Sequence, residues 1–190
     1  MENTLILFPI KIKFYKNFLE KQEIKNILIK IKKYKHINHG ALKGEASSTH
    51  KLLTNFLKDS DVENKLNIVI KQYSKILGIE NQIIFHSWTN IQKKYSKLNK
   101  HSHANSPISG VLYLNVDKES SKIYFYNPNP YISVINIKNS NESNYEYIYF
   151  QPEIGDLILF PGWLLHGSND EINKSKERIA LSFNTIDEIN

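Results

Sequence analysis

The stretch KHSHANSPISGVLYLNV, residues 100–116, places two histidines directly ahead of a run with strand character. In an extended chain, side chains two positions apart point to the same side, so His101 and His103 can direct both imidazoles at one point. This is a metal-ligand spacing, although histidines two apart also occur on solvent-facing strands. A third histidine, His166, follows further along. Because three imidazoles would then converge, we interpret all three as metal ligands rather than structural histidines.

The composition restricts which metal and which partners fit. The chain has 190 residues, of which 41% are hydrophobic, and this is enough for one domain with a core. It contains no cysteine, so any metal must be held by nitrogen and oxygen ligands, which favours iron, zinc, copper or nickel. The formal charge of +6 comes from lysines spread along the chain, so nucleic acid is not indicated as a partner.

Arg178 is the one arginine among 25 basic residues. A planar guanidinium holds a carboxylate through two parallel hydrogen bonds, which an ammonium group cannot copy. The alternation of ERIALSFN, residues 177–184, puts Arg178 on a small, polar face and the larger apolar side chains on the other. We therefore expect Arg178 to line a polar cavity and to bind an anion there.

No targeting segment or membrane span is expected. The apolar run at residues 5–8 is interrupted by Pro9 and Lys11 and is too short for either role. No later stretch approaches spanning length. We expect a cytoplasmic protein without a membrane partner, and the sequence leaves the oligomeric state open.

The first 80 residues are predicted to be mainly helical after an opening strand. Hydrophobic spacing and capping residues predict a strand over Thr4–Phe14 and helices over Asn17–Lys35, Lys51–Lys58 and Val62–Leu77, the last ending at Gly78. His36 and His39 lie in the polar segment HINHG and are interpreted as surface residues. The apolar faces of these helices need a sheet to pack against.

From Gln82 onward the hydrophobic period changes from helical to two. Alternation puts Ile84, His86, Trp88 and Asn90 on one face of the first strand, and His86 is interpreted as a buried structural histidine. Further strands are predicted over Ile108–Val116, Lys122–Tyr126, Tyr131–Ile137, Tyr145–Gln151, Asp156–Phe160 and Arg178–Asn184. Short strands separated by Asn-Pro and Gly-Asp turns favour a jelly roll.

Four motifs in order, HSHANSPISGVLYLNV, FYNPNP, PEIGDLILFPGWLLHGS and ERIALSFN, resemble the bacterial and phage family of 2-oxoglutarate- and Fe(II)-dependent oxygenases with an H-x-H motif. The likeness covers roughly residues 84–184. It implies an α+β, mainly β fold: a cupin-like double-stranded β-helix, or jelly roll, with N-terminal helices on the major sheet. We expect a single domain over residues 1–190, with a helical support region at 1–80 and the β-helix core at 81–190.

The resemblance also implies a cofactor set and roles for individual residues. Fe(II) would be held by the catalytic residues His101, His103 and His166, and 2-oxoglutarate and O2 would be consumed. The far carboxylate of 2-oxoglutarate would bind Arg178. Further hydrogen bonds to this cosubstrate are expected from Tyr113, Ser109 and Ser182.

The sequence departs from the commonest oxygenase pattern at two positions. The usual ligand triad is H-x-Asp/Glu followed by a distal histidine, whereas His103 stands at the carboxylate position. Either the site holds iron through three histidines, or a carboxylate comes from elsewhere and His103 supports it from outside. In addition, the serine often found two residues after the arginine is Ala180 here, and Ser182 lies further along.

The activity expected from these motifs is hydroxylation of a C–H bond, coupled to oxidative decarboxylation of 2-oxoglutarate to succinate. Two other readings stay open: a cupin-like metal enzyme that does not use 2-oxoglutarate, and a jelly-roll binding module without activity. The substrate, a small molecule or a protein side chain, cannot be read from the sequence. The polar loop at residues 136–144 is expected to overhang the mouth and influence specificity.

Overall fold

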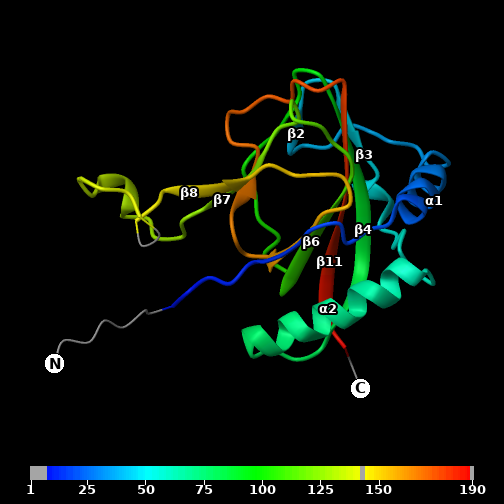
Figure 1. Cartoon of the computed structure of the whole chain (residues 1–190), viewed down its shortest axis with the longest axis horizontal. Coiled ribbons are helices and arrows are strands. Elements are labelled where there is room, and N and C mark those ends of the chain that lie inside the picture. Colours follow the sequence, from blue (N-terminus) through cyan, green and yellow to red (C-terminus); the bar gives the residue numbers. More distant parts are fainter. Residues whose placement is uncertain (1–7, 142–143, 189–190) are drawn as a thin grey trace.

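The computed structural model describes residues 8–141 and 144–188, and its centre is a pair of antiparallel sheets (Figure 1). The larger sheet has the strand order β1-β9-β6-β11-β4-β3, and the smaller has the order β10-β7-β8. A two-stranded ladder, β2–β5, stands beside them. In chain order the strands are β1 (Lys13–Tyr15), β2 (Leu42–Lys43), β3 (Ala46–Ser48), β4 (Gln82–Lys93), β5 (Lys97–Leu98), β6 (Ile108–Asn115), β7 (Ile123–Tyr126), β8 (Tyr147–Phe150), β9 (Leu157–Pro161), β10 (His166–Gly167) and β11 (Glu177–Asp187). The predicted mainly β double-stranded β-helix is confirmed.

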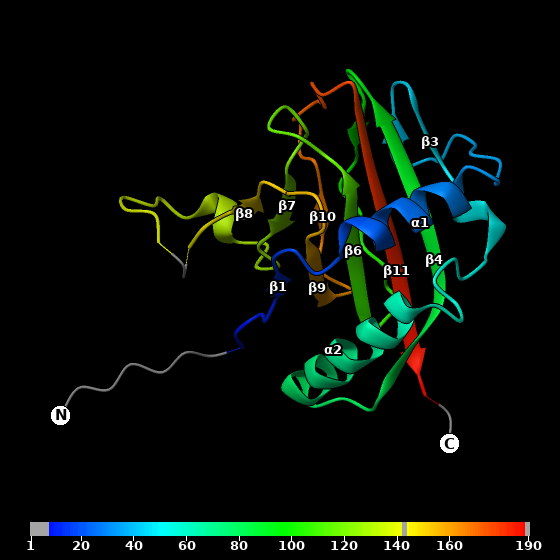
Figure 2. The same cartoon turned by 45° about the vertical axis from the view of Figure 1, so that its right-hand side comes forward.

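Two helices, α1 (Lys21–Ile31) and α2 (Asp61–Leu77), cover one face of the larger sheet, as Figure 2 shows. The Ser60 hydroxyl accepts a hydrogen bond from the Glu63 amide at the start of α2, and Gly78 ends that helix with φ of +70°. The apolar faces of α1 and α2 form one buried cluster with the side chains of β6 and β11 that point toward the helices. The predicted packing of N-terminal helices on the major sheet is therefore confirmed.

Strict alternation along β6 and β11 separates this helix-side core from the space between the sheets. Leu112 and Leu181 belong to the helix-side cluster, whereas Tyr113 and Ala180 belong to a second cluster between the two sheets. Since successive strand residues face opposite sides, Arg178 points into the same inter-sheet space as Ala180. The polar face predicted for ERIALSFN is thus the face that lines the cavity.

A β-bulge in β4 changes the face pattern predicted for that strand. The pairing of β11 with β4 shifts register between Asn184, which pairs with His86, and Thr185, which pairs with Ile84. The extra residue reverses which side the chain presents. Ile84 therefore packs in the helix-side core, whereas His86 does not, and the prediction that they share a face is wrong.

Several predicted element boundaries are wrong for identifiable reasons. Helix α1 is shorter than the predicted Asn17–Lys35 because Asn17 has φ of +50° and the capping box at Glu20 sets the start. The predicted helix Lys51–Lys58 is a single 3-10 turn, η1 (His50–Leu52), ended by Leu53 with φ of +50°. Of the predicted strand Thr4–Phe14, residues 4–7 lie outside the described residues, and β1 begins only at Lys13.

The predicted strand Tyr131–Ile137 is also wrong. This segment contains a 3-10 turn, η2 (Ile132–Val134), on an arm that extends from β7 and β8 away from the sheets (Figure 1). Tyr131, Val134 and Ile135 are residue types that favour strands, but all three are more than half exposed and the segment belongs to none of the described sheets. The expected specificity role of residues 136–144 stays a prediction, and residues 142–143 lie outside the described residues.

The predicted division of a single domain at residue 80 also stays a prediction. Strands from both sides of that position share the larger sheet, because β1 and β3 pair with β9 and β4. No helix within residues 8–141 or 144–188 is long and apolar enough to cross a bilayer. The expected cytoplasmic location stays a prediction.

Gly162 is required where the segment carrying His103 crosses the end of β9. The His103 amide donates to the Gly162 carbonyl at 2.7 Å, and a Cβ on Gly162 would lie 2.9 Å from the His103 carbonyl oxygen and clash with that of Ser106. Both neighbours are backbone and cannot rotate away. We expect Gly162→Ala to lower the free energy of unfolding by about 3 kcal/mol, measured by chemical denaturation.

The control for this substitution is Gly40→Ala, because a Cβ on Gly40 meets nothing within 4 Å. Equal stability of the two variants would contradict a requirement for close approach at Gly162.

Candidate functional site

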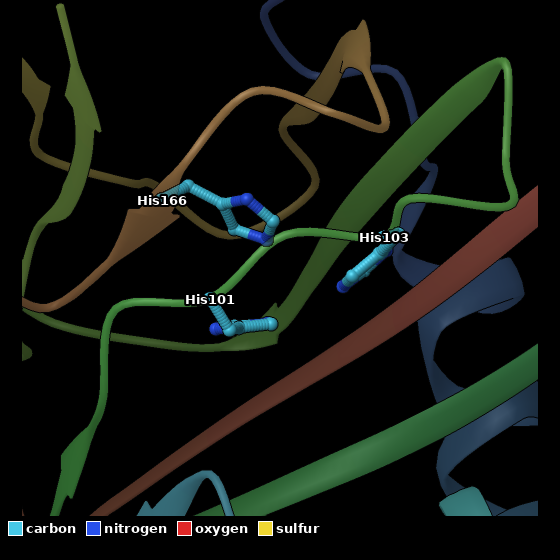
Figure 3. Close-up of side chains that lie close together, drawn as sticks. All are labelled: His101, His103 and His166. Atoms are coloured by element: carbon cyan, nitrogen blue, oxygen red, sulfur yellow. The ribbon is translucent and has the colours of Figure 1, made fainter. Parts of the chain in front are cut away.

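Three histidines converge between the sheets, as Figure 3 shows. His166 opens β10 and forms a β-bridge with His101, each amide donating to the other's carbonyl at 2.9 Å. His103 follows two residues after His101, and the ring centroids lie 4.4 to 5.2 Å apart. One ligand atom from each residue lies within 4.8 Å of the others, so the three imidazoles could hold a metal ion. The sequence prediction that these side chains meet is correct.

Hydrogen bonds orient all three rings in the tautomer that binds metals. His101 Nδ1 lies 2.8 Å from the Asn99 carbonyl oxygen, and His166 Nδ1 lies 2.9 Å from that of Leu164. His103 Nδ1 lies 2.7 Å from Asn184 Oδ1. Because these oxygens only accept hydrogen bonds, each Nδ1 must carry the proton, which leaves each Nε2 with a free lone pair. Such outer partners are typical of metal-ligating histidines.

Burial keeps the triad in its neutral, ligating form. It lowers the pKa of His103 to about 4, with a further contribution from His101. Burial likewise lowers the pKa of His166, which is 4% exposed, and of His101. No carboxylate of the described residues joins the three neutral imidazoles, so they form a nitrogen-only donor set, which suits a divalent transition metal such as iron.

Arg178 lies in the same cavity as the triad and is 5% exposed. Its Nε donates to the Ser121 carbonyl at 3.2 Å, its Nη1 donates to Gln92 Oε1 at 2.8 Å, and its guanidinium carbon lies 5.3 Å from the centre of the Tyr113 ring. Within the part of the chain that the structure describes, no carboxylate forms an ion pair with Arg178. Burial lowers its pKa accordingly.

Three buried polar atoms beside Arg178 have no hydrogen-bond partner among the described residues: Gln92 Nε2, the Tyr113 hydroxyl and Ser121 Oγ. Burial raises the pKa of Tyr113 to about 12, so its hydroxyl remains a donor at neutral pH. Buried donors normally have partners. The chemistry of these donors, together with the guanidinium, suits an anionic, oxygen-rich group such as a dicarboxylate.

The predicted cosubstrate residues occupy two different places. Tyr113 and Ser182 line the cavity with Arg178, and so does Ala180. Ser109 does not line it; its hydroxyl lies 2.9 Å from His103 Nδ1 and donates to Asn184 Oδ1 at 2.8 Å. In this position Ser109 orients His103 rather than facing the Arg178 pocket.

Sequence reasoning missed Gln92, Ser121 and Asn184 as site residues. Gln92 continues the alternation of Trp88 and Asn90 by two positions, so the pattern could have revealed it. Alternation along ERIALSFN puts Asn184 on the same face as Arg178, but it does not indicate that Asn184 contacts His103. Ser121 lies between β6 and β7, where no periodicity indicates the direction of a side chain.

Removing the amide of Asn184 tests how much the orientation of His103 contributes. We expect Asn184→Ala to weaken Fe(II) or Co(II) binding about 10- to 100-fold, as is usual when an outer partner of a metal ligand is lost. The measurement is anaerobic metal titration with far-UV circular dichroism as a check on folding. Unchanged metal affinity with an intact fold would show that His103 does not depend on this bond.

Fold and site together define a non-haem iron oxygenase that uses 2-oxoglutarate. The sequence profile of the family described as "Putative 2OG-Fe(II) oxygenase" matches residues 86–184. The chain belongs to this family and is an oxidoreductase whose cofactors are Fe(II) and 2-oxoglutarate. A search of curated proteins finds no match.

Solved structures with the same fold have little sequence in common with this chain. A 2OG-Fe(II) oxygenase family oxidoreductase from Burkholderia pseudomallei has a TM-score of 0.66 at 12% identity, over 92% of this chain and 84% of that one. A Pseudomonas putida prolyl-4-hydroxylase has 0.62 at 12%, over 95% and 94%. HygX from Streptomyces hygroscopicus, with nickel, 2-oxoglutarate and hygromycin B bound, has 0.63 at 12%, over 95% and 84%.

Proposed function

We propose that this protein hydroxylates a C–H bond of its substrate and couples that reaction to the oxidative decarboxylation of 2-oxoglutarate to succinate. The observation that carries the proposal is the placement of a buried guanidinium, which has no ion-pair partner among the described residues, in one cavity with three convergent imidazoles. The cupin-like alternative needs the imidazoles but not the guanidinium. A binding module without activity needs neither.

We assign Fe(II) ligation to His101, His103 and His166. The nitrogen-only triad and the Nδ1 contacts of all three rings support a three-histidine site over one completed by a carboxylate. Within the described residues, no Asp or Glu joins this group of convergent ligand atoms. His103 then stands where most oxygenases of this kind use a carboxylate.

We assign the far carboxylate of 2-oxoglutarate to Arg178, with hydrogen bonds from Tyr113 and Ser121. The partnerless donors of these two residues support this assignment. Gln92 holds the guanidinium in place through Nη1 and has its own amide nitrogen left to donate. Ser182 is positioned on the cavity wall between Arg178 and Asn184 along β11.

The bound metal would supply O2 activation coupled to loss of CO2 from 2-oxoglutarate. The chain contributes positioning and the exclusion of water. Phe125 and Phe160 are each 2% exposed, and their ring centroids lie 6.2 and 4.6 Å from that of His166. These two apolar rings lie against His166 and exclude water from that side of the triad, which protects a reactive centre from solvent.

The experiment combines purified protein, Fe(II), 2-oxoglutarate and O2 and measures succinate. Slow succinate release is expected even without substrate, and omission of Fe(II) should abolish it. Metal binding without any effect of 2-oxoglutarate on the anaerobic absorption spectrum would favour the cupin-like alternative. Absence of metal binding would favour a module without activity.

We propose a small molecule or a protein side chain as the substrate. HygX was crystallised with hygromycin B, and the Pseudomonas putida protein is a prolyl-4-hydroxylase. Structures of similar fold therefore bear names from both classes.

A further inference from the structure

Three further histidines form a second group beside the triad. His39 precedes β2, His50 begins η1 and His86 lies in β4, and their ring centroids are 4.6 Å apart for His39 and His50 and 5.0 Å for His50 and His86. The Trp88 ring lies 4.9 Å from His50 and from His86, and 5.5 Å from His103. A continuous row of rings thus leads from half-buried His39 to the triad. We call His39, His50, His86 and Trp88 the histidine wall.

The histidine wall and the Arg178 pocket flank the triad in different directions. In the ladder between β4 and β11, Gln92 pairs with Arg178, whereas His86 pairs with Asn184, the residue that contacts His103. The Arg178 pocket therefore lies along the strands from the triad. His50 follows β3, which pairs with the opposite edge of β4, so the wall lies across the strands. A cosubstrate held by Arg178 would not need the ring nitrogens of His39, His50 and His86, which do not line the Arg178 cavity.

One atom of the wall indicates that a ligand belongs there. His86 is 4% exposed, and its Nε2 is buried without a hydrogen-bond partner. The remaining histidine, His36, shows the contrast, because its Nε2 lies 2.8 Å from Thr89 Oγ1 and its Nδ1 lies 3.1 Å from the Tyr34 carbonyl oxygen. Both ring nitrogens of His36 therefore have partners within the fold, as is usual for a structural histidine.

A second metal ion explains the wall less well than an organic group does. In the triad every Nδ1 faces an oxygen, but His39 Nδ1 faces the Ala41 amide at 3.4 Å and must accept its proton. The proton of neutral His39 then sits on Nε2, which becomes a donor rather than a ligand. Among the residues that the structure describes, His101, His103 and His166 are the one group whose ligand atoms converge.

Among the described residues, no carboxylate acts on the three histidines of the wall, and the lysine that acts on His39, Lys51, is exposed to solvent. Burial lowers the pKa of His50 to about 4, and the neighbouring His39, His86 and His101 lower it further. Burial also lowers the pKa of His39 and His86. The cavity's cations, Arg178 and Lys122, lie in the pocket assigned to the cosubstrate. A charged substrate group buried at the wall would lose water. Lys51, the cation that acts on His39, is exposed to solvent and would offset that cost only weakly for an anion.

We propose that the histidine wall is the subsite for the substrate to be oxidised, and that it takes an uncharged group with hydroxyl or amide hydrogen bonds. His86 Nε2 and the His39 Nε2 proton are its contact atoms, and Trp88 is the apolar side next to the triad. This inference rests on the proposed function, since it assumes that a substrate must reach the triad. The two ends of the site then bind groups of different charge: Arg178 binds an acid, and the histidine wall binds a neutral polar group.

The test is a binding screen with matched pairs of compounds, on protein loaded with Ni(II) and 2-oxoglutarate so that no turnover occurs. Each pair shares a scaffold and differs in charge: sugars against sugar acids and amino sugars, and dipeptide amides against free dipeptides. Binding is followed by ligand-observed NMR. Neutral members are expected to bind better than their charged partners, and His39→Phe and His86→Phe should each weaken that binding about tenfold.

The control variant is His36→Phe, which changes a histidine outside the wall and should bind the neutral compounds as the wild type does. The affinity for 2-oxoglutarate, titrated separately, should be the same in all variants. Preference for charged members, absence of neutral binders, unchanged binding in both wall variants, or a second equivalent of metal lost in His39→Phe would each overturn the proposal. Failure of the wild type to bind 2-oxoglutarate would instead contradict the proposed function.

Discussion

Replacing His166 by alanine is expected to abolish specific metal binding while the fold survives. The β-bridge between residues 101 and 166 uses backbone atoms alone, so it remains when the ring is removed. Two of the three imidazoles then remain to hold the metal. Loss of an outer partner of a ligand costs 10- to 100-fold in metal affinity, so loss of the ligand itself should cost more than about 100-fold. Anaerobic titration with Co(II), followed by its visible absorption, measures this directly.

The matched control is His36→Ala, because His36 is half-buried and hydrogen-bonded but lies outside the triad. It should bind Co(II) as the wild type does. A His166→Ala protein that keeps wild-type metal affinity, with circular dichroism unchanged, would remove the triad as the metal site.

His103 allows a sharper version of the same test. If His103 is a ligand, His103→Asp recreates the commonest H-x-Asp triad and should keep metal bound, whereas His103→Ala should lose it. If His103 only supports a ligand from outside, aspartate and alanine should behave alike. The two substitutions thus decide between the alternatives that the sequence left open.

Much of the site could be predicted from the sequence because its geometry follows from strand alternation. The face of ERIALSFN that carries Arg178 and the shared side of His101 and His103 need only a period of two. The convergence of His166 with these histidines depends on a bridge across 65 positions of chain. No local pattern encodes that bridge, and the family resemblance supplied it.

The errors occurred where local propensity competes with tertiary structure. The bulge between Ile84 and His86 cannot be read from alternation, yet it decides that His86 joins the histidine wall. His36 and His39 were interpreted as surface residues because their segment is polar. Both are half-buried, since the chain folds back against β4. Their partners come from distant segments, which composition cannot reveal.

Arg178→Lys is expected to weaken 2-oxoglutarate binding about 100-fold while metal affinity stays unchanged. Lysine keeps the positive charge, but it cannot form two parallel hydrogen bonds to a carboxylate while also donating to Ser121 and Gln92. Loss of one or two charge-assisted hydrogen bonds in a buried site corresponds to a factor of this size. Anaerobic titration of the Fe(II) protein with 2-oxoglutarate measures it by absorption.

The matched control is Lys97→Ala, which removes a cation that pairs with Asp170 outside the cavity. It should leave both affinities unchanged, which separates the guanidinium's hydrogen bonds from the general effect of a positive charge. Wild-type affinity for 2-oxoglutarate in Arg178→Lys would mean that the buried guanidinium serves the fold rather than the cosubstrate. The cupin-like alternative would then account for the metal triad better than a 2-oxoglutarate-dependent hydroxylase does.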